Sequence, residues 1–137
     1  MELITEKQFE IRFSEVDMMK VVWHGSYPIY FEDAREAFGA QWGLSYQRYL
    51  DEKVYAPIVE LDIKYKRPLI YGMKPLVRIK YVPTQSAKII FDYEIVDPVD
   101  GTVFVTAHSV QVFMDFNYQL ILYNPEFYLK WKEQVGV

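Results

Sequence analysis

Cysteine is absent from this chain, and histidine occurs only at His24 and His108 among its 137 residues. The lack of cysteine excludes disulfides, thiolate nucleophiles and cysteine metal sites. The two histidines lie far apart in the sequence, without the spacing of paired metal ligands. We therefore expect no structural metal.

Long apolar runs and a basic amino-terminal segment are missing as well. The apolar stretches are short and interrupted by charge, which argues against a membrane-spanning helix. The opening residues, MELITEKQFE, lack the basic start and apolar stretch of a secretory signal, so the cytoplasm is the expected compartment. The formal net charge of −4 argues against a broad nucleic-acid-binding surface, because phosphate neutralisation requires clustered Lys and Arg.

Apolar and aromatic side chains are abundant, at 51% and 18% of the sequence. A chain of this length can bury one core, and no repeat, low-complexity segment or linker divides it. The sequence therefore predicts a single folded domain over residues 1–137.

One long helix is predicted, from about Pro28 to Trp42. Pro28 suits the first helical position, Ser26 or Tyr27 could cap the first turn, and Gly43 supplies a stop. One face of the helix is mostly apolar and can be buried. Its residues recur at spacings of three and four, with Phe31 beside them: Tyr30, Ala34, Ala37, Phe38, Gln41 and Trp42.

Asp17 and His24 fall just ahead of this helix, and Glu32 and Asp33 fall near its positive end. The first N–H groups of a helix have no partner within it, and the summed peptide dipole favours developing negative charge in front of them. A carboxylate and a histidine at that position suit acyl transfer.

Residues that alternate between apolar and polar predict five strands, and the last strand is expected to be central because both of its faces are rich in apolar or small residues. The order is one strand, the long helix, and then four strands that run mostly as hairpins, which is an α+β domain with a helix against an antiparallel sheet. One helix covers only one face, so the other side or an edge is expected to pack on a second subunit. The strands are expected at 7–13, 59–66, 76–82, 87–96 and 102–115, with a helical turn at 45–53 and a terminal helix at 125–134.

The run DMMKVVWHGSY from Asp17 to Tyr27, followed by YFEDAR from Tyr30 to Arg35, resembles the signature of hot-dog-fold thioesterases of the 4-hydroxybenzoyl-CoA and short acyl-CoA thioesterase type. The shared pattern is an aspartate, a short spacer that often contains glycine, two small β-branched residues, an aromatic residue, a histidine and then a tyrosine. The resemblance implies the hot-dog fold, in which a curved five-stranded antiparallel sheet wraps one long helix. It also implies a homodimer or homotetramer with each active site at a subunit boundary.

By the same resemblance, the substrate is an acyl-CoA or acyl-carrier-protein thioester, and coenzyme A enters only as part of the substrate, with no metal or other cofactor. Asp17 is implied as the catalytic carboxylate, acting as nucleophile or as general base for a water. His24 is implied to shape the loop and to hydrogen-bond the substrate or Asp17. The backbone N–H groups around His24 and Gly25 would hold the oxyanion.

Further candidates for substrate binding are Val22, Trp23, Gly25, Tyr27, Lys66 and Lys88. The lysines would meet the phosphates of coenzyme A, although a solvated strand face is the simpler interpretation of both. Tyr27 would line the core or the pocket wall.

Lys20 departs from the family pattern, because many relatives have glycine there. Its side chain could narrow the pocket, recognise an acidic acyl group, or pair with Asp17 and lower the pKa of that carboxyl. Lys20 also keeps open a second hypothesis, a hot-dog protein that binds an acyl thioester without cleaving it. A third hypothesis is a hot-dog dehydratase, which the order of Asp17 before His24 disfavours.

Overall fold

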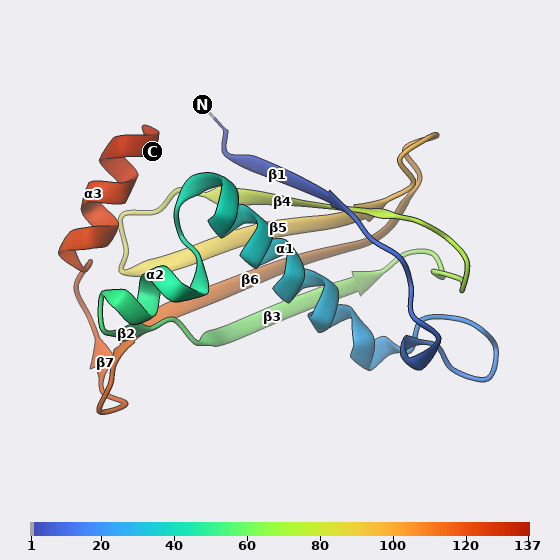
Figure 1. The fold of residues 1–137 in the computed structure, drawn as a ribbon, viewed down its shortest axis with the longest axis horizontal. Coiled ribbons are helices and arrows are strands. Elements are labelled where there is room, and N and C mark those ends of the chain that lie inside the picture. Colours follow the sequence, from blue (N-terminus) through green and yellow to red (C-terminus); the bar gives the residue numbers. More distant parts are fainter. Residues whose placement is uncertain (1) are drawn as a thin grey trace.

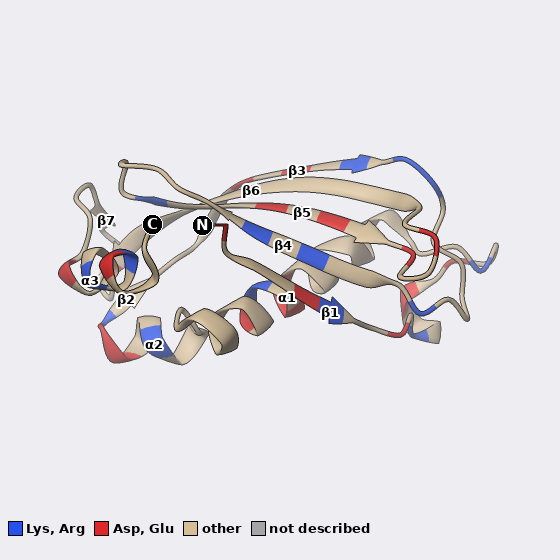
Figure 2. Cartoon of the chain, turned by 90° about the horizontal axis from the view of Figure 1, so that it is seen from above, with Lys and Arg blue, Asp and Glu red and all other residues tan. Residues whose placement is uncertain are grey.

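The structure is a computed structural model that describes residues 2–137. A single antiparallel sheet forms one layer, and helices α1 and α2 cover one of its faces (Figures 1 and 2). The strands are β1 (Ile4–Gln8), β2 (Val54–Tyr55), β3 (Ile58–Tyr65), β4 (Leu76–Val82), β5 (Lys88–Val96), β6 (Val103–Asp115) and β7 (Leu120–Ile121). The helices are α1 (Tyr27–Trp42), α2 (Tyr46–Asp51) and α3 (Glu126–Val135).

The long strands follow the order β1-β4-β5-β6-β3, with β6 between β5 and β3. The predictions of the long helix, of the four later strands and of a central last strand are confirmed, as are the helical turn and the terminal helix. In β4 every second residue is buried, namely Val77, Ile79 and Tyr81. This is why apolar residues at every second position predicted these strands. The α+β class is likewise confirmed.

Two predictions about strands were wrong. The first strand spans Ile4–Gln8 rather than 7–13, because the chain leaves the sheet after Phe9 and enters a short 3-10 helix at Phe13–Glu15. Phe13 is 76% exposed, so its place in an alternating pattern did not signal a buried strand face. The sheet has seven strands rather than five, since the two-residue strands β2 and β7 pair with the end of β6 and are too short to show a period.

Helix α1 packs its apolar face on the sheet and ends where glycine allows it. Tyr30, Phe31 and Phe38 are buried, and the Phe38 ring meets the Phe91 ring edge-on. Gly43 follows the helix with φ of 102°, a left-handed conformation that side chains disfavour. The α3 residue Trp131 donates from its ring nitrogen to the Trp42 carbonyl at 2.6 Å, which closes this end of the core.

The face of the sheet that carries no helix, called here the open face, is charged. Asp62, His108, Asp92 and Lys80 lie side by side on neighbouring strands. The His108 Nδ1 atom is 2.6 Å from Asp92 Oδ1, so this half-buried histidine is hydrogen-bonded within the sheet. In the next row, Arg78 pairs with both Glu94 and Glu6.

Strand β1 forms one edge of the sheet, and strand β3 forms the other. The only ladder partner of β3 among the described residues is β6, so its outer row of backbone groups faces away from the sheet. Seven of its eight residues are exposed, and the apolar residues Val59, Leu61 and Tyr65 are among them. An edge with this much apolar surface is suited to pairing with another strand.

Candidate active site

Asp17 begins a tight hairpin that projects beyond the amino-terminal end of α1 (Figure 1). Its backbone N–H donates to the Val21 carbonyl, and its own carbonyl accepts from the Lys20 N–H, both at 2.9 Å. The side-chain oxygen Oδ1 accepts from the Met19 N–H at 2.8 Å. No hydrogen bond among the described residues uses the second carboxylate oxygen, Oδ2, which leaves that atom for chemistry.

Lys20 occupies the left-handed position of this hairpin, with φ of 63°. A turn of this kind is often followed by one left-handed residue, which is commonly glycine. The geometry therefore explains why the family pattern favours glycine at this point. Of the three possibilities considered for Lys20, pairing with Asp17 is not seen, because Lys20 forms no ion pair with that carboxylate within residues 2–137. A role in narrowing the pocket or in recognising an acidic acyl group stays a prediction.

Glu15 fixes the hairpin to α1. Its buried carboxylate oxygen Oε1 accepts from the Arg12 N–H at 2.8 Å and from the Tyr30 hydroxyl at 3.0 Å. Burial, together with this hydrogen bond, raises the pKa of Tyr30 far above its ordinary value, so the phenol keeps its proton and donates it. The Glu15 carbonyl also accepts from Trp23 and Ser26.

The sequence analysis did not identify Glu15. Its only signal was a carboxylate placed among apolar residues beside the recognised motif.

His24 lies in a 3-10 turn, His24–Ser26, that leads directly into α1. The N–H groups of His24 and Gly25 donate no hydrogen bond within the described residues, as expected at a helix start. A Cβ atom on Gly25 would lie 2.2 Å from the Trp23 ring, so only glycine fits beneath that ring as it stands. The Tyr65 hydroxyl donates to the His24 carbonyl at 3.1 Å and ties the end of β3 to this turn.

The capping predictions for α1 were wrong. Ser26 stands at the cap position, but its hydroxyl donates to the Glu15 carbonyl instead of accepting from the first turn. Its backbone is already helical, because Ser26 is the last residue of the 3-10 turn. No acidic residue lies in the first turn, so Glu32 and Asp33 lie too far along the helix to meet its positive end.

The remaining candidates do not gather in one place. Val22 and Tyr27 are buried in the core, whereas Trp23 is exposed beside His24. Lys66 follows the end of β3 near the hairpin, and Lys88 begins β5 near α3. One chain therefore does not bring both lysines to a common anion, and their roles in binding stay predictions.

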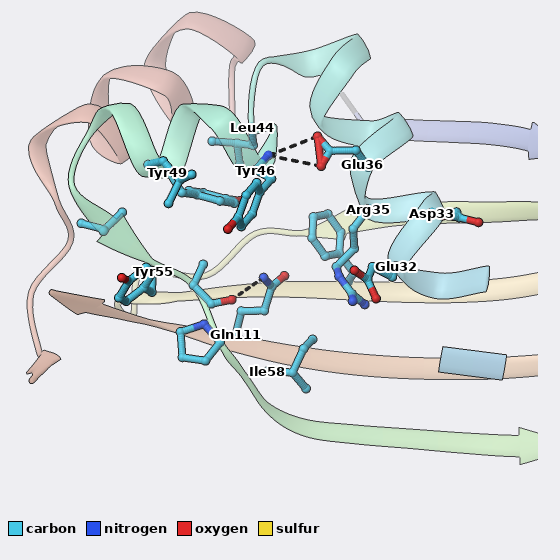
Figure 3. A pocket seen from close by; sticks show the side chains of 15 residues that line it. Glu32, Asp33, Arg35, Glu36, Leu44, Tyr46, Tyr49, Tyr55, Ile58 and Gln111 are labelled. Atoms are coloured by element: carbon cyan, nitrogen blue, oxygen red, sulfur yellow. Dashed lines mark hydrogen bonds between the residues drawn. The ribbon is translucent and has the colours of Figure 1, made fainter. Parts of the chain in front are cut away.

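A cavity of about 660 Å³ opens further along α1, between that helix, α2 and the sheet (Figure 3). Its size is that of a small-molecule site. Apolar side chains form much of its wall, among them Leu44, Tyr49, Leu50, Val54 and Phe91. The Ile58 end of β3 lies at this cavity, whereas the Tyr65 end lies at the hairpin.

Polar residues also line the cavity. Glu32, Asp33 and Glu36 come from α1, and Gln111 comes from β6 (Figure 3). Arg35 donates to the Tyr93 hydroxyl at 3.0 Å, which in turn lies 2.6 Å from Ser109 Oγ. None of these residues was predicted to line a cavity. Ser109 and Gln111 are polar residues at alternate positions of an apolar strand, a pattern that can indicate a polar floor.

Among residues 2–137, no group of three or more His, Asp or Glu side chains is arranged to hold a metal ion. Within the same range, no helix combines the length and the apolar character needed to cross a membrane.

Comparison with known families decides the assignment. A model of the thioesterase-like superfamily matches residues 11–131, which include the hairpin, α1 and strands β2 to β7. The chain belongs to this superfamily.

Individual relatives agree with this membership. A Bacillus subtilis protein named "Putative acyl-CoA thioesterase YneP" is 30% identical over 112 residues, which cover 82% of this chain and 80% of that protein. The crystal structure of protein TT1821 from Thermus thermophilus has a TM-score of 0.83 and 25% identity, and the match covers 94% of this chain and 97% of that one. A DHNA-CoA thioesterase from Staphylococcus aureus has a TM-score of 0.79 at 23% identity, and the match covers 97% of this chain and 91% of that one.

The hot-dog fold is therefore confirmed, and so is the prediction of a thioester hydrolase at the level of the family. The role of Asp17, the acyl group, the assembly and the narrower 4-hydroxybenzoyl-CoA assignment stay predictions.

Proposed function

We propose that this protein hydrolyses an acyl-CoA thioester to a carboxylic acid and free coenzyme A, with Asp17 as the catalytic carboxylate. The observation that carries the proposal is the Asp17 hairpin, because it holds Oδ1 by backbone N–H groups and leaves Oδ2 unengaged within residues 2–137. The carboxylate attacks the thioester carbonyl or takes a proton from an attacking water. The names of YneP and of the Staphylococcus aureus enzyme support coenzyme A as the thiol.

The turn at the start of α1 supplies the second part of the proposed chemistry. The N–H groups of His24 and Gly25 donate no hydrogen bond within residues 2–137 and would suit an oxyanion. Thiolate is a good leaving group, so the proposal includes no strong acid, metal or cofactor. His24 then positions the turn, and its ring lies against Trp23 with 5.0 Å between centroids. The predicted compartment remains the cytoplasm.

The test is thiol release from short, long, aromatic and dicarboxylic acyl-CoAs. We expect saturable hydrolysis of at least one of these, and a loss of about 10²–10⁴-fold in kcat for Asp17→Asn. Asp97→Asn is the matched control, because Asp97 Oδ1 also accepts the N–H two residues on, at 2.8 Å, in a turn remote from the hairpin. Unchanged turnover in Asp17→Asn, with the control also active, would remove Asp17 from the mechanism.

We also propose that the active unit is a dimer in which the β3 edges of two copies pair in antiparallel fashion. The exposed apolar residues of this edge support the pairing. Charge supports the pairing as well. Glu60 and Asp62 precede Lys64 along one face of β3, so in an antiparallel pair the acidic residues of one copy approach the lysine of the other.

The dimer would join two features that lie apart in one chain. The two ends of the eight-residue β3 are roughly 23 Å apart. In an antiparallel pair, the Tyr65 end of one copy, next to its hairpin, lies beside the Ile58 end of the other, next to its cavity. Each active site would then combine Asp17 of one protomer with the cavity of its partner.

Sedimentation or light scattering of the Leu61→Lys variant tests the assembly. We expect the wild type to have the mass of a dimer and Leu61→Lys to have that of a monomer without thioesterase activity, because two ammonium groups would meet near the two-fold axis. Val99→Lys is the control, since Val99 is 94% exposed in a turn far from this edge. A Leu61→Lys variant that remains a fully active dimer would contradict the proposed interface.

A further inference from the structure

Two groups of exposed apolar side chains lie at opposite ends of the molecule. The first is the tip of the hairpin at the proposed active site, where Met18 is 99% exposed and Met19 is 74% exposed. The second, called here the aromatic cluster, consists of Tyr55 from β2 with Phe116 and Tyr118 from the turn between β6 and β7. Large apolar side chains that are exposed as a group indicate an interaction surface.

The aromatic cluster is ordered by contacts among its own rings. The Tyr55 ring centroid lies 4.8 Å from that of Phe116 and 5.7 Å from that of Tyr118. Tyr118 is nevertheless 71% exposed, so an apolar surface remains for a further contact. Methionine suits such a surface, because its side chain is flexible and its polarizable thioether packs well against aromatic rings.

Asp17 and Asp115 begin hairpins of the same construction, and these hairpins present the two surfaces. The Oδ1 atom of each aspartate accepts from the N–H two residues on, at 2.8 Å in the first hairpin and 2.9 Å in the second. The fourth residue of each hairpin, Lys20 or Tyr118, has φ of 63°. Both turns are therefore held by their own hydrogen bonds, and surfaces that are already ordered lose little conformational entropy when they meet.

The proposed pairing of β3 edges would bring the two surfaces together. Figure 1 shows the Asp17 hairpin beyond the Tyr65 end of β3 and the turn between β6 and β7 beyond the Ile58 end. In an antiparallel pair, the first end of one copy lies beside the second end of the other. The hairpin of each copy then extends toward the aromatic cluster of its partner.

Charge favours the same arrangement. Figure 2 shows basic residues at the end of β3 and in the loop that follows it. Lys20, Lys64 and Lys66 belong to this end of the molecule and form no ion pair within residues 2–137. Glu32 and Asp33 line the cavity at the other end and form no ion pair in that range either. Antiparallel pairing brings the lysines of one copy toward the carboxylates of the other, so a second copy is the partner that fits.

We infer that the Met18–Met19 turn of each protomer packs on the aromatic cluster of its partner, and that this contact positions Asp17 at the partner's cavity. The inference rests on the proposed function and adds the contact that fixes the hairpin in the shared site. Asp17 adjoins Met18 within a hydrogen-bonded hairpin, so a turn seated on the partner carries the carboxylate with it. The two methionines are then positioning residues.

Cross-linking tests the contact, because the chain has no cysteine of its own. In Met18→Cys with Tyr118→Cys, we expect a short bismaleimide to join two protomers, which a denaturing gel shows as a covalent dimer. Met19→Cys with Phe116→Cys tests a neighbouring register. The members of each pair lie at opposite ends of one chain, so only a link between chains can form. Val99→Cys with Tyr118→Cys is the matched control and should stay monomeric on the gel, because Val99 is exposed in a turn remote from β3.

Paired charges test the positioning role. Met18→Glu should lower kcat by about 10-fold, because the new carboxylate loses hydration against the rings and the displaced hairpin misplaces Asp17. Tyr118→Lys should have a similar effect, and Lys20 shows that φ of 63° accepts a lysine. The double variant should recover most of the activity, since the two charges pair across the interface. Met18→Glu with Val99→Lys has the same net charge and should recover none.

Several outcomes would overturn the inference. One is a dimer in which neither cysteine pair links more than the Val99 control. Another is wild-type kcat in Met18→Glu, or a double variant no more active than its Val99 control. A monomeric protein that pellets with phosphatidylcholine vesicles, and ceases to do so in Tyr118→Lys, would assign the apolar surfaces to a lipid and would overturn it as well.

Thiol release separates this inference from the proposed function. Cross-linking of either cysteine pair, without hydrolysis of any acyl-CoA by the wild type, would support the contact and contradict the thioesterase reaction. Hydrolysis that depends on Asp17, in a dimer whose cysteine pairs do not link, would do the reverse.

Discussion

The two ends of α1 differ in how they are built. At the amino-terminal end, a hairpin and a 3-10 turn are held by hydrogen bonds to Glu15 and Asp17, and a carboxylate and free N–H groups are exposed. Further along the helix, packing of apolar side chains leaves a cavity. One end has reactive groups and the other has space for an acyl group, so neither makes a complete site alone.

The largest expected effect is the recovery of activity when two inactive variants exchange subunits. Asp17→Asn removes the carboxylate, and Leu50→Trp fills the cavity, so each homodimer is expected to be nearly inactive. After random exchange of subunits, half of the dimers are mixed and each has one intact site, which restores about one quarter of wild-type activity. Thiol release before and after exchange measures this.

Differently tagged subunits, captured through one tag and detected through the other, show whether exchange has occurred. If mixed dimers form and activity stays at the level of the separate variants, the carboxylate and the cavity of one site belong to the same chain.

An intermediate effect is expected where the hairpin is fixed to the helix. Glu15→Leu leaves the Arg12 N–H and the Tyr30 hydroxyl without their acceptor, and should lower the free energy of unfolding by about 1–3 kcal/mol. Glu36→Leu is the matched change beside the cavity. There only an exposed contact with the Tyr46 N–H is lost, and we expect a change within about 0.5 kcal/mol. Urea unfolding of both variants makes the comparison, and equal losses would contradict it.

The smallest expected effect comes from relief of backbone strain. Lys20→Gly should raise the free energy of unfolding by about 0.5–1 kcal/mol, because φ of 63° suits glycine better than lysine. Lys53→Gly, at φ of 58° outside the hairpin, should give a similar gain. Thermal unfolding measures both, and a loss of stability in Lys20→Gly would indicate a favourable contact of the lysine side chain.

Local patterns were enough to predict much of the fold. The long helix was predicted from apolar residues that recur every 3.6 positions, and the longer strands from apolar residues at every second position. Gly43 marked the end of the helix. All these signals lie within short stretches of the sequence. The start of β1 was misplaced because Phe9 and Ile11 pack on the core outside the sheet. Short strands such as β7 form only because β6 is present beside them.

The candidate site was predictable only in part, for a similar reason. Asp17 and His24 lie in one short motif, so their neighbourhood could be inferred from the sequence. The contact of Glu15 with Tyr30 crosses fifteen residues, and that of Gln111 with Ala56 crosses fifty-five, so the folded chain alone brings these groups together. The unusual backbone conformation of Lys20 was not predicted either, because it depends on the hairpin that forms around it.

The open face of the sheet limits how the molecule can associate. Its rows of Asp92, His108 and Lys80 and of Glu94 and Arg78 would have to lose water before another sheet could stack on them, which disfavours layered aggregation. Strand addition is then left to the two edge strands. An antiparallel pair of β3 strands occupies the β3 edges of both copies, and the other edge, β1, is only five residues long and mostly exposed and polar. The charge pattern on a surface remote from the site thus favours a closed assembly over fibres.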